Sequence, residues 1–247
     1  MLPHPADATA PLPDAECANC GAPVADRYCG SCGQKRVTRL GFGDLASTAL
    51  AELASLDTAF LRTFAGLSIR PGRVARDYID GHRVRYLNPL KYALLAVTVY
   101  VVLAHLFGAQ VGPERRRVDD GGQFELVVSL LPYLMILALL PAAALQSLLS
   151  RSSGDRVAEC YVFGLYAYSH VCWILTPLVL LGIYGIPYGF FVVHGLRLGF
   201  WIWATAGFYG SFSIKVIAKS IFVFLVFFFS TLVLAVVANA LIRWWNA

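Results

Sequence analysis

Five long apolar segments constrain the fold of this chain more than any other feature. They cover residues 90–107, 124–149, 157–181, 188–209 and 220–242, and each has at least the roughly 17 residues that a transmembrane helix needs. Among the 247 residues, 58% are hydrophobic and 14% are charged, whereas soluble domains contain roughly 25% charged residues. A soluble globule would lack polar surface, so we expect a mainly α-helical, polytopic membrane bundle of about five spans over residues 90–247.

The fourth apolar segment is the weakest because it contains Arg197. A re-entrant pair or an interfacial helix is the alternative to a span at this position. The positive charges predict the orientation. With alternating spans, 15 of the 20 Lys and Arg residues lie on the same side of the membrane as the N-terminus, four lie on the other side and Arg197 lies within a span. This asymmetry predicts a cytoplasmic N-terminus and a C-terminus on the opposite side.

Positive charge beside the first span also indicates the partners. The formal net charge is +5, and basic residues at a cytoplasmic membrane face attract anionic lipid head groups. We expect membrane lipids as partners and no nucleic acid, because no aromatic and basic binding module accompanies the charge. The oligomeric state does not follow from the sequence.

Four cysteines near the N-terminus form two CxxC pairs, each followed directly by glycine. They are Cys17, Cys20, Cys29 and Cys32. A two-residue gap lets both sulfurs of a pair reach one metal ion, and four thiolates suit Zn²⁺. We expect a miniature zinc ribbon over residues 17–39, with a structural Zn²⁺, after a disordered leader at residues 1–16. Disulfides, redox-active thiols and an iron site are the alternatives.

Residues 40–89 show a different pattern, which predicts amphipathic helices. Apolar residues recur every three or four positions from Leu45 to Phe64, and Arg70-Pro71-Gly72 interrupts the stripe. A short helix is expected over residues 71–80, ended by Gly81. A helical pair that packs on itself is one interpretation. We favour helices that lie at the cytoplasmic membrane interface, because a span follows immediately.

The order of these motifs resembles the bacterial membrane family catalogued as domain of unknown function 3667. The resemblance rests on the two CxxC pairs and on a series of residues that runs from Leu56-Asp57 through Arg70-Pro71-Gly72 to Asn88-Pro89. It covers about the first 105 residues. The resemblance implies a zinc-ribbon protein of the bacterial inner membrane with several spans, which would make the outer side periplasmic. It implies no reaction.

Ionisable residues inside the predicted spans are candidates for function. Tyr166 and His170 share one face of the third predicted helix, and His194 and Arg197 share one face of the fourth. These neighbouring helices would bring His170 and Arg197 to comparable depths, and the four residues could form a pocket for an anionic head group. The alternative is that these side chains bridge helices or reach backbone carbonyls.

A second candidate binding site lies at the predicted interface. Its residues combine positive charge with an aromatic ring: Arg70, Arg73, Arg83, Arg85 and Tyr86. They could bind a phospholipid or another phosphate-bearing ligand. Ordinary anchoring by positive and aromatic residues at the membrane surface is the alternative explanation.

These observations favour a membrane scaffold or adaptor whose zinc ribbon contacts a cytosolic protein partner. A lipid or small-solute transporter, or a membrane enzyme that acts on lipid, is the alternative, with its site around Arg197 and His170. The chain has no HExxH, GxSxG or P-loop motif. The sequence therefore names no catalytic residue and favours a protein that is not an enzyme.

Overall fold

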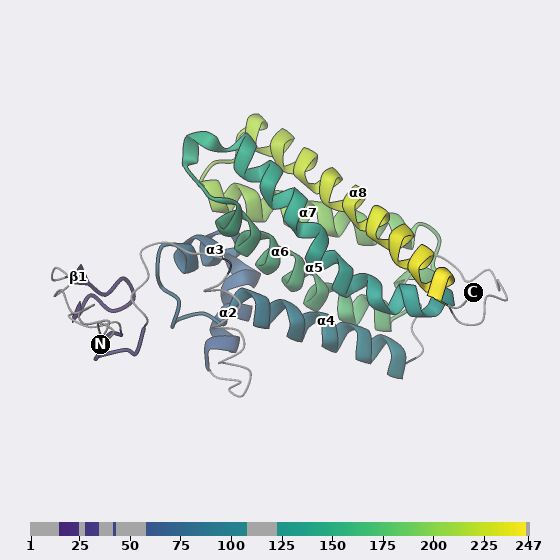
Figure 1. Cartoon of the computed structure of the whole chain (residues 1–247), viewed down its shortest axis with the longest axis horizontal. Coiled ribbons are helices and arrows are strands. Elements are labelled where there is room, and N and C mark those ends of the chain that lie inside the picture. The colour runs from purple at the N-terminus through teal and green to yellow at the C-terminus, as the bar shows by residue number, and fades with distance from the viewer. Residues whose placement is uncertain (1–14, 25–27, 35–41, 43–57, 108–122, 246–247) are drawn as a thin grey trace, which may run out of the picture.

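The computed structural model describes residues 15–24, 28–34, 42, 58–107 and 123–245, and within these ranges the chain is mainly helical (Figure 1). A two-stranded antiparallel sheet pairs Ala15 with Val24 and Glu16 with Pro23. The elements in chain order are β1 (Ala15–Glu16), β2 (Pro23–Val24), α2 (Thr58–Ile69), α3 (Pro71–Ile79), α4 (Pro89–Leu106), α5 (Gln123–Leu149), η1 (Arg151–Ser153), α6 (Val157–Leu180), η2 (Ile183–Gly185), α7 (Gly189–Tyr209) and α8 (Ile214–Trp245).

The helices α4 to α8 run side by side and form the body of the molecule, as Figure 1 shows. The N-terminal strands lie beyond one end of these helices, and the C-terminus lies at the other end. Helix α6 is central, with 18 of its 24 residues buried. Helix α8 is peripheral and exposes large apolar side chains such as Leu225 and Phe229 along its length. Such a surface suits lipid better than water.

Four helices in the described chain are long and apolar enough to cross a membrane, and they agree with four of the five predicted spans. They are Pro89–Leu106, Ser129–Leu149, Val157–Leu180 and Ile214–Trp245. The remaining predicted span, the fourth in chain order, exists as α7, a helix of 21 residues, but it is not among these four candidates. Its middle carries His194 and Arg197, whose polarity lowers its mean hydropathy.

The short helix α3 packs into the bundle, against α6 and α7, while α2 contacts α3 and α6. Pro71 begins α3 at a position where its missing N–H costs nothing. At Gly72 a Cβ atom would overlap the backbone of α7 at Ala204, Gly207 and Phe208. The glycine therefore permits α3 to touch α7 backbone to backbone. The segment that precedes α2, where the apolar stripe begins, lies outside the described residues.

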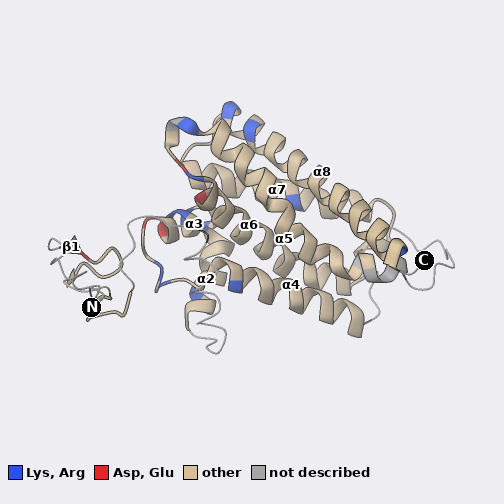
Figure 2. Cartoon of the chain, in the orientation of Figure 1, with Lys and Arg blue, Asp and Glu red and all other residues tan. Residues whose placement is uncertain are grey.

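Basic residues gather at one end of the bundle. Figure 2 shows most of the Lys and Arg residues at the end nearest the N-terminal strands, whereas Arg197 lies within α7 and Arg243 lies near the C-terminus. In sequence these are the residues around α3, the turn between α5 and α6, and the start of α8. We call this the basic end. The cysteines predicted to bind metal lie beyond the same end.

Candidate metal centre and polar clusters of the bundle

The two CxxC pairs form two similar turns. In the first, the Gly21 N–H donates to the Cys17 carbonyl at 2.8 Å, and in the second the Gly33 N–H donates to the Cys29 carbonyl at 2.8 Å. Both glycines have a positive φ, of 74° and 70°, which side chains disfavour. The glycine after each pair is thus required by the backbone that brings the two sulfurs together.

The four thiols converge on one point. Their sulfur atoms all lie within 4.8 Å of one another, with 3.6 Å between those of Cys17 and Cys32 and between those of Cys20 and Cys29. Thiolates 2.3 Å from a tetrahedral Zn²⁺ would lie about 3.8 Å apart. All four cysteines are free rather than joined in disulfides. The cluster therefore has the size and chemistry to hold a metal ion.

The electrostatics of the cluster also favour a cation. Backbone N–H groups of Cys32 and Ser31 donate to the Cys29 sulfur and lower its pKa to about 6. The Ala22 backbone N–H favours the Cys20 thiolate in the same way, but hydrogen bonds with the other three cysteines, together with burial, raise the Cys20 pKa to about 12. Four thiols this close cannot all ionise without a positive ion between them.

The cysteine module is fastened to the basic end of the bundle by Gln34. Its Nε2 donates to the Gly81 carbonyl at 2.5 Å, and its Oε1 accepts from the backbone N–H groups of Arg83 and Val84 at 3.2 and 3.4 Å. Gly81, with φ +118°, leaves no room for a Cβ beside Ala18. The loop between α3 and α4 therefore receives both turns of the module, through Ala18 and Gln34.

The other residues of the predicted interfacial site support anchoring more than a convergent ligand site. Arg70 and Arg73 are exposed. The Arg85 guanidinium lies 5.6 Å from the ring centroid of Tyr86, whose hydroxyl donates to Asp77 at 3.0 Å. Burial raises the pKa of Tyr86, and the Asp77 carboxylate adds to this shift. The ring of Tyr86 thus belongs to the structure of the loop.

Arg76, another basic residue of this region, forms an ion pair. Arg76 of α3 binds the Asp155 carboxylate with both terminal nitrogens, at 2.7 and 3.3 Å, and its guanidinium lies 3.9 Å from the ring centroid of Phe208. Hydrogen bonding to Asp155 raises the pKa of Arg76, against the opposing effect of burial. This pair ties α3 to the start of α6 and the end of α7.

His170 is buried and its ring joins three helices. Nδ1 lies 2.9 Å from the Tyr92 hydroxyl of α4, and Nε2 lies 3.2 Å from the Ser68 hydroxyl of α2. The single proton of Ser68 goes to the Phe64 carbonyl, so Ser68 accepts from Nε2–H and Nδ1 accepts from Tyr92. Both ring nitrogens of His170 are thereby engaged within the protein.

Tyr166 and His194 also have partners in the chain. The buried Tyr166 hydroxyl donates to the Leu87 carbonyl at 2.5 Å and so joins α6 to the loop before α4. His194 Nδ1 lies 2.8 Å from the Phe190 carbonyl, and the His194 ring packs 4.1 Å from the Phe190 ring. The contacts of Tyr166, like those of His170, bridge separate parts of the chain, whereas His194 contacts a backbone carbonyl of its own helix. Both cases fit the alternative to a ligand pocket.

Arg197 has a different environment from His170. The groups that interact electrostatically with it include Tyr100, Tyr168, Tyr184 and Cys172. The hydrogen bonds and ring contacts of His170 within the described chain are with other residues: Ser68, Tyr92, Phe64 and Phe200. Tyr168 and Cys172 lie on the opposite face of α6 from His170, because two residues turn an α-helix by about 200°. The guanidinium Nε is buried and has no hydrogen bond within the described chain, whereas the Tyr100 hydroxyl faces that of Tyr184.

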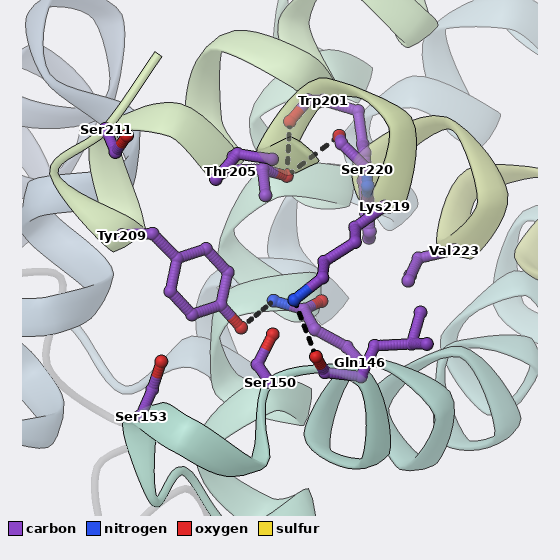
Figure 3. Close-up of a pocket in the computed structure, with 12 residues that line it drawn as sticks. Gln146, Ser150, Ser153, Trp201, Thr205, Tyr209, Ser211, Lys219, Ser220 and Val223 are labelled. Atoms are coloured by element: carbon purple, nitrogen blue, oxygen red, sulfur yellow. Dashed lines mark hydrogen bonds between the residues drawn. The ribbon is translucent and has the colours of Figure 1, made fainter. Parts of the chain in front are cut away.

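A polar cavity that the sequence did not predict opens between α5, α7 and α8 at the basic end (Figure 3). Its volume is about 200 Å³, and it is lined by polar side chains that include Gln146, Tyr209, Lys219 and Ser220 and by the indole of Trp201. These residues come from helix ends far apart in sequence. In the sequence, Lys215 and Lys219 served only to place the start of α8 on the predicted inner side of the membrane. Nothing in the sequence indicated that Lys219 would line a cavity.

Comparison with known proteins gives a match to a protein-family model. No curated protein and no solved structure matches this chain. The resemblance noted in the sequence is confirmed for part of the chain. This part holds α2, α3, the loop between α3 and α4, and most of α4, but not the four cysteines. Residues 57–101 match the model of a family described as "Protein of unknown function (DUF3667)".

Proposed function

We propose that this protein is a membrane-anchored adaptor, which presents a zinc-bound cysteine module to a protein partner at the cytosolic face of a bacterial inner membrane. The observation that carries the proposal is the docking of the module by Gln34 on the loop between α3 and α4. A flexible tether would leave the module free to turn. A docked module has a fixed orientation relative to the membrane, which is the property an adaptor needs.

The composition of the site supports zinc and a structural role. Four cysteine sulfurs would complete a tetrahedral Zn²⁺ shell and leave no open position for a substrate or water. Among the described residues, the apolar centre of the module consists of Cys17, Val24 and Cys29, with Ala22 and Cys32 packed against it. Such a small core cannot supply much folding free energy, so metal binding would supply it. A closed site of this kind favours binding over catalysis.

The outward side of the module provides a place for a partner to contact. Tyr28, which directly precedes the second cysteine pair, is 56% exposed. Exposed tyrosines are frequent in protein interfaces, because an apolar ring is combined with a polar hydroxyl. The partner would be a protein on the cytosolic side.

The test combines metal analysis with crosslinking in cells. A photoreactive amino acid at Tyr28 should form a defined crosslinked species with a partner, and Cys29→Ser should abolish both that species and the bound zinc. Arg197→Ala should leave the crosslink unchanged, because Arg197 is far along the bundle from the module. A crosslink that survives Cys29→Ser, or zinc content that this variant does not lower, would refute the proposal.

A transporter or lipid enzyme with an anionic head-group site is the second candidate, and one observation favours it. Arg197 Nε is a buried donor without a hydrogen bond in the described chain. An anion bound there would satisfy this donor. His170 has no role in this version, because both its nitrogens are engaged. Arg197→Ala should then abolish retention of an anionic lipid by the purified protein without unfolding it.

A further inference from the structure

The cavity at the basic end combines buried polar groups with apolar walls. Gln146, Thr205 and Ser220 are buried, whereas the Lys219 side chain is exposed at the cavity and its Nζ donates to the Leu149 carbonyl at 2.7 Å. Figure 3 shows Lys219 directed toward Gln146 and the Tyr209 hydroxyl. The volume of about 200 Å³ exceeds the roughly 30 Å³ of one water molecule. It is smaller than the roughly 300–1,000 Å³ of cofactor pockets, so a small polar group fits best.

The lining contains more N–H donors than the hydrogen bonds that these donors make within the described chain. Lys219 has three N–H bonds and Gln146 has two, and within the described chain each uses one, toward the Leu149 carbonyl and the Tyr209 hydroxyl. The Trp201 Nε1–H is buried and has no acceptor among the described residues. The cavity therefore presents one buried N–H without an acceptor, beside an exposed ammonium group whose remaining N–H bonds face solvent.

The hydroxyl groups of the cavity are arranged in series and do not remove this surplus. Ser220 Oγ donates to Thr205 Oγ1 at 3.1 Å, and Thr205 Oγ1 donates to the Trp201 carbonyl at 2.8 Å (Figure 3). Among the described lining residues none is Asp or Glu. A cation and several neutral donors without a carboxylate favour an anion with several acceptor oxygens.

The position of the cavity identifies where such an anion comes from. It lies where α5 and α7 end and α8 begins, at the end where the basic residues gather. This is the level at which a phospholipid would place its phosphate, and anionic lipids concentrate on a positive membrane face. A phosphate ester dissolved in the cytosol would reach the same level.

We propose that this cavity binds the phosphate group of an anionic ester, with Lys219 as its charged contact and Gln146 and Trp201 as neutral donors. The phosphate oxygens would satisfy the donors left over by the protein. The site is separate from Arg197 and from the cysteine module, so the proposal does not depend on the adaptor function. It adds a lipid- or metabolite-sensing site to the cytosolic end.

Binding of two probes, the lipid phosphatidate and the soluble ester glycerol 3-phosphate, to the purified full-length chain tests this proposal. Native mass spectrometry should show retention of phosphatidate but not of phosphatidylcholine, and Lys219→Met should weaken phosphatidate binding by about tenfold or more, since a hydrogen bond to a charged group is lost. Lys219→Arg should restore it. Trp201→Phe, which keeps an aromatic ring and removes the N–H, should weaken binding in the same direction.

Lys215→Met is the matched control, because Lys215 is an exposed cation on the same helix and does not line the cavity. Equal losses for Lys219→Met and Lys215→Met would show diffuse attraction and overturn the proposal, as would absence of binding to both probes. Glycerol 3-phosphate is the second probe. Competition by it would support the site and assign it to soluble phosphate esters, whereas retention of phosphatidate against it would assign the site to lipid.

Discussion

At the scale of single residues, the intramembrane polar groups divide into those with partners and those without. His170 lies at a contact of α2, α4 and α6, with hydroxyl groups on both nitrogens. The sequence predicted the helix that carries His170 and the face that it shares with Tyr166, since spacing along a helix fixes both. It did not predict its separation from Arg197, because the rotation of α6 relative to α7 depends on packing between helices.

We predict that His170 and Tyr92 stabilise the fold as a pair. His170→Leu leaves the buried Tyr92 hydroxyl without its acceptor, so His170→Leu and Tyr92→Phe should be less than additive in the free energy of unfolding. The expected coupling is about 0.6–2 kcal/mol, in the range of hydrogen bonds between membrane helices. Unfolding of the two single variants and the double variant in detergent measures it.

Tyr168 provides the control for this cycle. Its hydroxyl donates to the Pro132 carbonyl rather than to His170. Tyr168→Phe and His170→Leu should therefore add within about 0.3–0.5 kcal/mol. If the Tyr92 pair were equally additive, the bridging role of His170 would be wrong.

At the scale of elements, the sequence predicted the helix positions well and one helix start poorly. The segment predicted at residues 157–181 appears as α6 (Val157–Leu180), and the helix expected at 71–80 appears as α3 (Pro71–Ile79). Apolar runs and prolines define these ends. Helix α8 begins at Ile214, before the predicted residue 220, because Lys215 and Lys219 made its first turns look like a loop.

The contact between α3 and α7 gives a prediction that concerns one glycine. Gly72→Ala should lower the free energy of unfolding by about 1–3 kcal/mol or more, because the added Cβ overlaps the backbone of α7. Gly195→Ala is the control. Gly195 lies within α7, and a Cβ there would meet nothing within 4 Å, so this change should be neutral or stabilising by about 0.5–1 kcal/mol. Thermal unfolding of both variants in one detergent compares them.

The docking of the cysteine module predicts a local effect of Gln34. Gln34→Leu removes the Oε1 that accepts from the Val84 N–H, whereas the Arg83 N–H keeps the Gly81 carbonyl at 2.9 Å as an acceptor. Hydrogen exchange of the Val84 amide should therefore become faster, while bound metal stays unchanged. Tyr28→Leu changes an exposed side chain of the same module and should leave exchange as it is. Unchanged exchange in Gln34→Leu would mean that the module is not held in this way.

At the scale of the whole molecule, charge and hydropathy predicted the arrangement of the chain but not its polar sites. The basic end was expected because Lys and Arg cluster in segments that alternate with apolar runs. The four-cysteine cluster was expected as well, since the spacing within each CxxC pair is short. The cavity of Lys219 and the Arg76–Asp155 pair join residues 70 or more positions apart. A single sequence holds no record of such pairings, because they arise only when helices pack.

The number of crossings decides on which side the C-terminus lies, and α7 decides the number. By length α7 spans about 30 Å, which is the thickness of the hydrocarbon core, and it runs among the four apolar helices (Figure 1). Arg197 would be costly in lipid, by about 2.5–3.5 kcal/mol, but its Nε is buried in the bundle. We therefore predict that α7 crosses the membrane, and that the C-terminus lies on the opposite side from the cysteine module.

Reporter fusions test this prediction. If the module is cytosolic, alkaline phosphatase fused after residue 247 should be active, and a fluorescent protein fused at the same place should be dark. The same reporters fused after Ser211, between α7 and α8, should give the reverse. Fluorescence at residue 247 would mean that α7 does not cross and that the chain has four spans.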